Sequence, residues 1–477
     1  MNKNRVFSNL IWRFAERIGA KLISLVISLI LARVLGPDVY GTLAIVLVIT
    51  TILQVFVESG FGTALIQKKN ADDLDFSSVF YFNVAICLLL YLLLFLCAPL
   101  ISKIYSRQEL TALIRAVGIV LIISGVKNVQ QAYVSKNMLF KRFFFSTLGG
   151  TIIGGTAGVI MALNGCGIWS YVTQYLLTEG LSTAILWLTV KWRPKAEFSF
   201  ERLKGLFSYG WKLLLASFLN VVSDQIRSLI IGLKYSSSDL SFYDKGRQFP
   251  NLITENVNTS IDSVLLPALS EQQTNIENVK TMTRRAVQLS SYIMWPLMIG
   301  MCVCARPFVQ LVLGDAWLPC VPFIQIFCLY YALWPIHTAN LNAIKSVGRS
   351  DIFLKLEILK KLLDLAVIAA TMFIGVKAMA IGLLAEGIAC QAINALPNSK
   401  LIGYKYIDQL KDILPSILAS IALGLAAYAV RLLGLGNLLT LLLQVITGFA
   451  VYIILSKAFK LESFSYVLSI VKGYLKK

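Results

Sequence analysis

Apolar runs of roughly 20 residues recur along the whole chain. A helix of that length covers the ~30 Å hydrocarbon core of a bilayer. Of the 477 residues, 57% are hydrophobic and 14% are charged, whereas soluble domains have about 45–50% apolar and about 25% charged residues. The runs therefore predict an all-α integral membrane protein with about fourteen transmembrane helices and no room for a soluble domain.

The predicted spans are joined by short connections that carry most of the charge. Their ranges are 10–34, 41–66, 78–100, 110–135, 143–164, 167–190, 208–234, 249–271, 286–313, 320–344, 353–375, 378–399, 412–433 and 437–457. In span five, Gly150, Gly154 and Gly158 repeat at four-residue spacing, which predicts a surface for close helix approach.

Basic residues are unevenly divided between alternate connections. With the N-terminus inside, the inner connections and the tail carry about 25 Lys and Arg residues and the outer connections about 7. Because cytoplasmic loops collect Lys and Arg, this asymmetry predicts that both termini are cytoplasmic. The segment Glu462–Lys477 is too short and too basic to span, and is expected to lie on the membrane surface, drawn to anionic lipid.

The longest inner connection divides the chain after six spans. The predicted organisation is an N-terminal lobe at 1–191, a cytoplasmic linker at 192–207, a C-terminal lobe at 208–403, and a region at 404–477 with the last two spans and a basic cytoplasmic tail. A weak repeat with a shift of about 203 residues supports the division, because it relates Leu35–Gly41 to Ser237–Tyr243. Repeats in one membrane orientation are typical of two-lobed transporters.

Charged residues also occur inside spans, where each costs at least ~2.5–3.5 kcal/mol at the membrane centre. They form polar stripes at helical spacing, which predicts a water-filled cavity with basic walls. The basic and amide members are Arg13, Arg17, Lys21, Lys212, Asn220, Arg227, Lys360 and Lys361. The acidic members are Glu16, Asp224, Glu255 and Asp262. Such a cavity suits an anionic ligand, best a phosphate or diphosphate.

Two interpretations of these stripes that involve no cavity stay open. Arg13 could extend to the inner headgroups, and Asp224 with Arg227 could form a purely structural pair. The aqueous segments contain no nucleophile–base pair and no metal-ligand spacing, and His337 is the single histidine. We therefore expect neither an enzyme nor a metal site, and no nucleic-acid partner.

The opening segments carry a family likeness. Arg17-Ile18-Gly19, then Ala32–Gly41, then Glu58–Gln67 resemble the polysaccharide transporter family. These are the Wzx-type flippases of the multidrug/oligosaccharidyl-lipid/polysaccharide (MOP) superfamily. The resemblance implies a MATE-like fold of two six-helix lobes in a V with two appended C-terminal helices, in the bacterial inner membrane.

The resemblance also implies a function. It implies alternating access that moves undecaprenyl-diphosphate-linked repeat units for lipopolysaccharide, capsule or exopolysaccharide synthesis. The basic stripe residues above would bind substrate, and the acidic ones would couple transport to a proton or sodium gradient, with no other cofactor. Membrane lipids and the polymerase and chain-length proteins of the pathway are the other expected partners.

Two alternatives remain at this point. A MATE-type small-molecule exporter would share the fold, but such exporters need a cavity dominated by carboxylates, which span one does not supply. A membrane glycosyltransferase or polymerase of the same pathway would need an acidic outer loop, and the first outer loop offers only Asp38.

Overall fold

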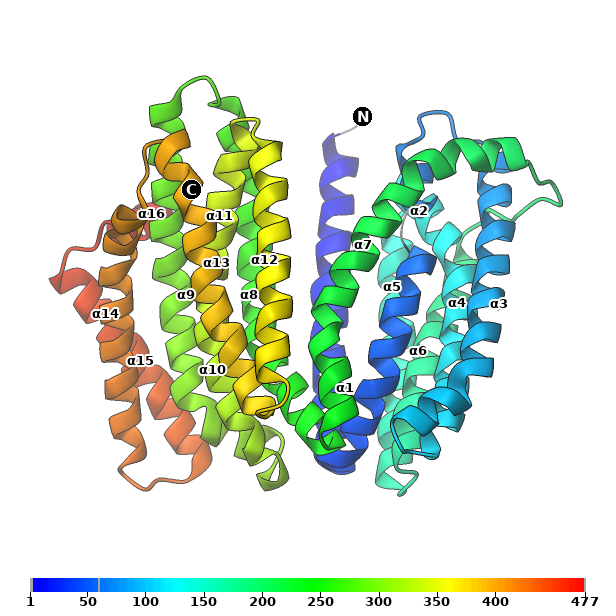
Figure 1. The fold of residues 1–477 in the computed structure, drawn as a ribbon, viewed down its shortest axis with the longest axis horizontal. Coiled ribbons are helices and arrows are strands. Elements are labelled where there is room, and N and C mark those ends of the chain that lie inside the picture. Colours follow the sequence, from blue (N-terminus) through cyan, green and yellow to red (C-terminus); the bar gives the residue numbers. More distant parts are fainter. Residues whose placement is uncertain (1–2, 59–60, 476–477) are drawn as a thin grey trace. The chain divides into compact units, whose positions relative to one another are not determined.

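A computed structural model gives the fold (Figure 1). It describes the backbone of residues 3–58 and 61–475, and their side chains except at 3–11, 14, 17, 58, 208–209, 470–471 and 473–475. Within these ranges the regular elements are helices. They are α1 (Lys3–Glu58), α2 (Phe61–Gln67), α3 (Asp73–Ile104), α4 (Glu109–Lys136), α5 (Phe140–Leu163), α6 (Ile168–Thr189), α7 (Phe200–Lys234), α8 (Ser237–Glu271), α9 (Ile276–Val312), η1 (Asp315–Cys320), α10 (Val321–Ala332), α11 (Trp334–Ser346), α12 (Ser350–Thr371), α13 (Val376–Leu401), α14 (Tyr406–Arg431), α15 (Asn437–Ala458) and α16 (Glu462–Leu475).

Within the described residues each predicted span lies mainly on helix, which confirms the all-α membrane fold. By length and composition, ten helices of the described chain can cross a membrane. In this count α1 appears once, although it contains the first predicted span and most of the second. The helices α6, α8 and α12 are not among the ten. Two of them, α8 and α12, carry predicted polar stripes, and the charged residues of these stripes lower the mean hydropathy of both helices.

The first two predicted spans form one bent helix. Gly36 interrupts α1 with φ 75° and ψ 172°, a conformation that glycine adopts without steric cost, and Pro37 follows it. Gly41 lies so close to α8 that an added Cβ would come 1.7 Å from the Ser237 carbonyl oxygen. The Ser237 hydroxyl also donates to the Asp38 carboxylate. The two segments related by the sequence repeat therefore meet at these residues.

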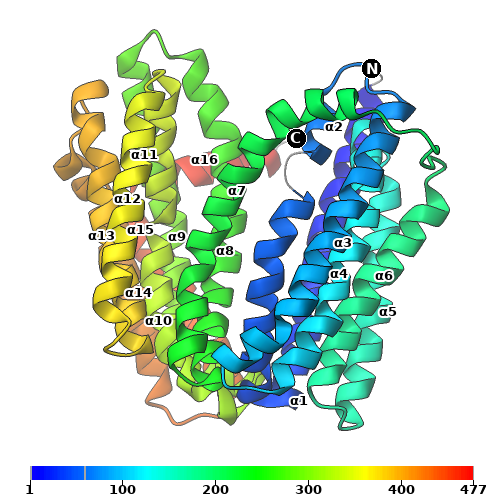
Figure 2. The ribbon, with the colours of Figure 1, turned by 45° about the vertical axis from the view of Figure 1, so that its right-hand side comes forward.

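The chain divides into two compact units, Met1–Ser241 and Phe242–Lys477. In the first, α5 packs along α6 and α3 along α4, as both views show (Figure 2). The predicted glycine surface of α5 is confirmed, because Cβ atoms added at Gly150, Gly154 and Gly158 would lie 2.4–2.6 Å from α6 atoms. By its contacts α7 belongs to this unit, since it touches α1, α2 and α3. The lobe boundaries predicted from the sequence, at 1–191 and 208–403, stay a prediction.

Exposed leucines on α3 show how the fold meets lipid. This helix is the most apolar of the candidate spans, with a mean hydropathy of 2.9. Its exposed leucines are Leu88, Leu89, Leu92, Leu93, Leu96 and Leu100. In water such a band would be a liability, but in hydrocarbon it is the expected outer face of a membrane helix.

The segment between α6 and α7 is tied to the first unit. The backbone N–H of Lys195 donates to Ser77 Oγ at 3.0 Å, and that of Ser199 donates to Ser78 Oγ at 2.9 Å. Gln130 Nε2 donates to the Trp192 carbonyl at 3.0 Å, and the Trp192 ring stacks on Tyr133 with centroids 6.0 Å apart. These bonds place the start of α7 against the ends of α2 and α3.

In the second unit, α9 is the central helix. It contacts η1, α10, α11, α14, α15 and α16. A buried polar network joins three of the neighbouring helices. Asn340 on α11 bonds Gln409 on α14 at 2.9 Å and Asn398 on α13 at 2.8 Å. Amide hydrogen bonds of this kind hold membrane helices together and keep most of the polar atoms away from lipid, although Asn398 Oδ1 is buried without a partner among the described residues.

Candidate functional site

The predicted stripe of α1 is partly occupied by internal partners. Arg13 Nη1 donates to Glu16 Oε2 at 2.8 Å. The Arg13 guanidinium also lies 5.1 Å from the centroid of the Phe143 ring of α5. Lys21, one turn further along, is exposed. The Arg17 side chain lies outside the described residues, so its predicted role stays a prediction.

The predicted stripe of α7 differs along its length. Lys212, Asn220 and Asp224 are exposed, whereas Arg227 is 7% exposed. Helix α7 packs on the part of α1 beyond Gly36, as the 5.2 Å separation of the Phe218 and Phe56 rings shows. A nearly buried guanidinium within an apolar helix is costly unless its charge is compensated, which makes this position the most constrained cation of the stripe.

The acidic residues of α8 lie beside α11 in the second unit. Asp262 Oδ1 accepts a hydrogen bond from Asn342 Nδ2 at 2.8 Å, and Asn258 Oδ1 accepts one from Thr338 at 2.7 Å. Glu255, two turns before Asp262, is exposed. The stripe is therefore partly a helix-packing seam, which the sequence interpretation did not distinguish from a cavity wall.

The predicted basic pair of α12 also has internal neighbours. Lys360 Nζ donates to Glu357 Oε1 at 2.6 Å, while Lys361 is half-buried. His337, on α11, is 3.0 Å from Asn394 Nδ2.

One intramembrane ion pair was missed by the sequence reasoning. Lys127 Nζ on α4 donates to Glu179 Oε2 on α6 at 3.0 Å and to Ser182 Oγ at 2.8 Å. The Lys127 side chain is 12% exposed. Lys127 and Glu179 are each isolated charges within an apolar run, and neither belongs to a polar stripe. The sequence signal that could have found the pair is an isolated basic residue in one span and an isolated acidic residue in a nearby span.

A compact ionic cluster lies where α2, α3 and α7 meet. The side chain of Asp75 is 0% exposed and accepts from Lys68 Nζ at 2.7 and 2.6 Å. Arg202 lies 3.6 Å from Asp75 and 3.5 Å from Asp72. Asp72 caps α3, and the backbone N–H of Asp75 that donates to it holds the pKa of Asp72 below its usual range.

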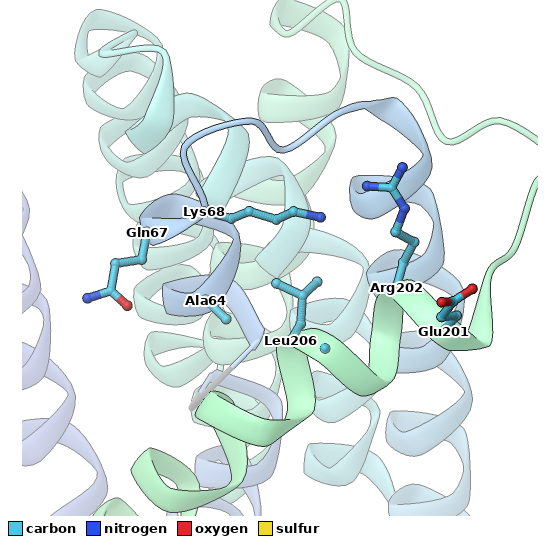
Figure 3. Close-up of a pocket in the computed structure, with 7 residues that line it drawn as sticks. Ala64, Gln67, Lys68, Glu201, Arg202 and Leu206 are labelled. Carbon is cyan, nitrogen blue, oxygen red and sulfur yellow. The ribbon is translucent and has the colours of Figure 1, made fainter.

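A cavity of about 690 Å³ adjoins this cluster. Figure 3 shows the Lys68 side chain extending past Leu206 toward the Arg202 wall, while Gln67 points to the opposite side. The lining residues are Ala64, Gln67, Lys68, Glu201, Arg202, Gly205 and Leu206. The lining carries two cations and one carboxylate, and both cations are already paired with Asp75.

The described residues contain no group of three or more His, Cys, Asp or Glu side chains that could hold a metal ion. All eight cysteines are free thiols. Several charges of the described membrane helices form ion pairs inside a unit, as Arg13 does with Glu16 and Lys360 with Glu357. Lys21 and Lys212 lie at exposed positions.

Comparison with known proteins identifies the family. A family model described as "Polysaccharide biosynthesis protein" matches residues 30–322. The chain is 23% identical to the teichuronic acid biosynthesis protein TuaB of Bacillus subtilis over 64% of this chain and 63% of TuaB. The match thus spans a little under two thirds of TuaB.

Two further relatives cover more of the chain. The succinoglycan biosynthesis transport protein ExoT of Rhizobium meliloti is 22% identical over 74% of this chain and 71% of ExoT. The lipopolysaccharide biosynthesis protein WzxC of Escherichia coli is 22% identical over 83% of each chain.

The fold has a solved counterpart. The inward closed conformation of the lipid II flippase MurJ superposes with a TM-score of 0.74 at 17% identity, over 94% of this chain and 98% of MurJ. At this identity the likeness shows a shared fold. The relatives are biosynthesis and transport proteins, which agrees with the predicted non-enzymatic class. The chain is a multi-pass membrane protein that belongs to the polysaccharide biosynthesis protein family.

Proposed function

We propose that this protein is a flippase that moves undecaprenyl-diphosphate-linked polysaccharide repeat units across the bacterial inner membrane by alternating access. The family match over residues 30–322 carries the proposal. The similarity to ExoT, a succinoglycan biosynthesis transport protein, and to WzxC, a lipopolysaccharide biosynthesis protein, supports it. The excess of Lys and Arg in the predicted inner connections supports an orientation with both termini in the cytoplasm.

The proposed substrate contacts are the basic residues of the stripes. Arg227 is the leading member, because it is nearly buried and a guanidinium matches the geometry of a diphosphate. Lys21 and Lys212 are exposed. The other proposed contacts are Arg13, Arg17, Asn220, Lys360 and Lys361.

The proposed driving force is a proton or sodium gradient. The carboxylates proposed to couple it are Glu16, Asp224, Glu255 and Asp262. Among them, Glu16 and Asp262 have described partners, Arg13 and Asn342, so occupation by an ion or a proton would have to compete with those bonds.

The decisive test is deletion of the gene followed by extraction of lipid-linked oligosaccharides. We expect completed repeat units to accumulate on the inner leaflet, where they stay protected from periplasmic sugar-modifying reagents. Incomplete sugars would instead indicate a transferase. Unchanged lipid-linked sugars combined with new sensitivity to cationic dyes would indicate a small-molecule exporter, and either outcome would overturn the proposal.

Single substitutions test the site. Arg227→Ala and Arg17→Ala should each reduce export at least tenfold, since loss of a charge-assisted bond of about 1.5–3 kcal/mol changes affinity by a factor of ten or more. Arg306→Ala, at an exposed arginine of α9, is the matched control and should leave export unchanged. Normal export from both site variants, at normal membrane levels of protein, would remove the assignment.

A further inference from the structure

A second cavity lies within the second unit. It measures about 1080 Å³ and is lined by α8, α9 and α16. Most of its walls are apolar, including Val257, Ile261 and Val264 of α8 and Leu289 and Ile293 of α9. Small-molecule pockets usually measure about 300–1,000 Å³, so the space is large enough for an extended hydrocarbon chain.

The polar edge of this cavity carries a cation with no described counter-charge. Arg285 of α9 lines the cavity and is exposed, and no ion pair or hydrogen bond engages it within the described part of the chain. Its neighbour Arg284 is committed elsewhere, because Nε and Nη2 both donate to Asp412, at 2.8 and 2.7 Å. Arg285 is therefore available to an anion at the cavity mouth.

Helix α16 forms the third wall. Its residues Phe464 and Val467 pack against the buried cluster around Tyr292 and Tyr452, which fixes the helix beside α9. Glu462, Ser463 and Tyr466 line the cavity. The charge of Glu462 interacts with that of Arg284, so it does not offset Arg285 alone.

We propose that this cavity binds one anionic phospholipid of the surrounding bilayer, with an acyl chain between α8 and α9 and the phosphate on Arg285. Apolar walls favour the chain because they remove it from contact with polar groups, and a guanidinium matches phosphate geometry. Arg285 is the one cation among the described lining residues, and its guanidinium can hold one phosphate through two parallel hydrogen bonds. The charge of +19 on the whole chain makes an anionic headgroup the complementary choice.

The test is native mass spectrometry of the purified full chain in nanodiscs that contain equal parts of phosphatidylglycerol and phosphatidylcholine. The wild-type protein should retain one phosphatidylglycerol after partial delipidation. Arg285→Gln should lower the ratio of bound to free protein by about tenfold, which corresponds to about 1.4 kcal/mol. Ala268→Phe, which fills the cavity from α8, should do the same while keeping the charge.

Arg306→Gln is the matched control, because it removes one exposed cation of α9 that does not line the cavity. It should leave phosphatidylglycerol retention unchanged. Equal retention by the wild type and Arg285→Gln would overturn the proposal, and so would retention of phosphatidylcholine at the same level. Added undecaprenyl phosphate that displaces phosphatidylglycerol through Arg285 would also overturn it, since the occupant would then be a prenyl lipid. The proposed transport function would survive each of these results.

Discussion

The buried carboxylate of Asp75 allows a quantitative prediction about what fixes the start of α7. Asp75→Asn keeps the shape of the side chain but removes its charge from Lys68 and Arg202, which lie 2.6 and 3.6 Å away. Removing one partner of a buried pair costs about 3–5 kcal/mol when the other charge stays buried. Lys68 is 30% exposed and Arg202 42%, so water recovers part of that cost, and we expect about 2–3 kcal/mol.

An exposed pair on the same helical turn supplies the control. Asp73 Oδ2 lies 2.9 Å from Lys195 Nζ, with 49% and 57% of the side chains exposed. Exposed ion pairs contribute about 0–1 kcal/mol. Both aspartates lie in the first turn of α3, so each interacts favourably with the helix dipole, and that contribution largely cancels in the comparison.

Two double-mutant cycles in detergent would measure the difference. One cycle combines Asp75→Asn with Lys68→Gln, and the other combines Asp73→Asn with Lys195→Gln, with unfolding followed by tryptophan fluorescence. The first coupling energy should be about 2 kcal/mol and the second below about 1 kcal/mol. Equal coupling energies in the two cycles would refute the argument that burial of Asp75 sets its importance.

Three further predictions concern the first unit. Gly41→Ala should lower transport and thermal stability together, because the new Cβ would lie 1.7 Å from the Ser237 carbonyl oxygen; wild-type behaviour in both assays would show that this approach is not needed. The lowered pKa of Asp72 stabilises the fold above its ordinary value of 3.8, and this stabilisation is lost as pH falls through the lower folded pKa. Asp72→Asn should therefore flatten the acid limb of a thermal-unfolding profile, and an unchanged limb would contradict the assignment. Glu16→Gln should weaken the internal partner of Arg13 and raise the affinity for a lipid diphosphate severalfold in a binding assay; a lower affinity would place Glu16 in the substrate site.

The sequence predicted the helices well because their signal is the simple length of an apolar run. Gly36 with Pro37 marked a break, yet whether spans one and two form two helices or one bent helix depends on the local backbone, which a hydropathy pattern does not contain. The glycine spacing of α5 predicted close approach without naming the neighbour, since any helix could supply it. The structure names α6.

The site was predicted less completely than the fold. Helical spacing shows which charged residues share a face of a helix, but it does not show which residues contact that face. Arg13 and Lys360 were read as cavity residues, and the structure adds Glu16 and Glu357 as their partners three residues away. Lys127 was missed because its partner lies on another helix. Long-range pairing of this kind depends on which helices are neighbours, and a single sequence without a fold does not specify that.

These ion pairs bear on how a membrane transporter can hold an anionic ligand at all. An unpaired cation at the membrane centre is costly to insert, whereas a cation already bonded to a carboxylate is inserted at much lower cost. An arginine such as Arg13 can therefore be stable in the empty protein and still serve a phosphate, provided that the phosphate replaces its carboxylate partner. The binding free energy then equals the difference between the free energies of the arginine–phosphate pair and the arginine–carboxylate pair. This difference is small enough for the ligand to be released on the other side of the membrane. A basic stripe with nearby carboxylates is thus better suited to transport than a stripe of bare cations, which would bind a diphosphate too tightly to let it go.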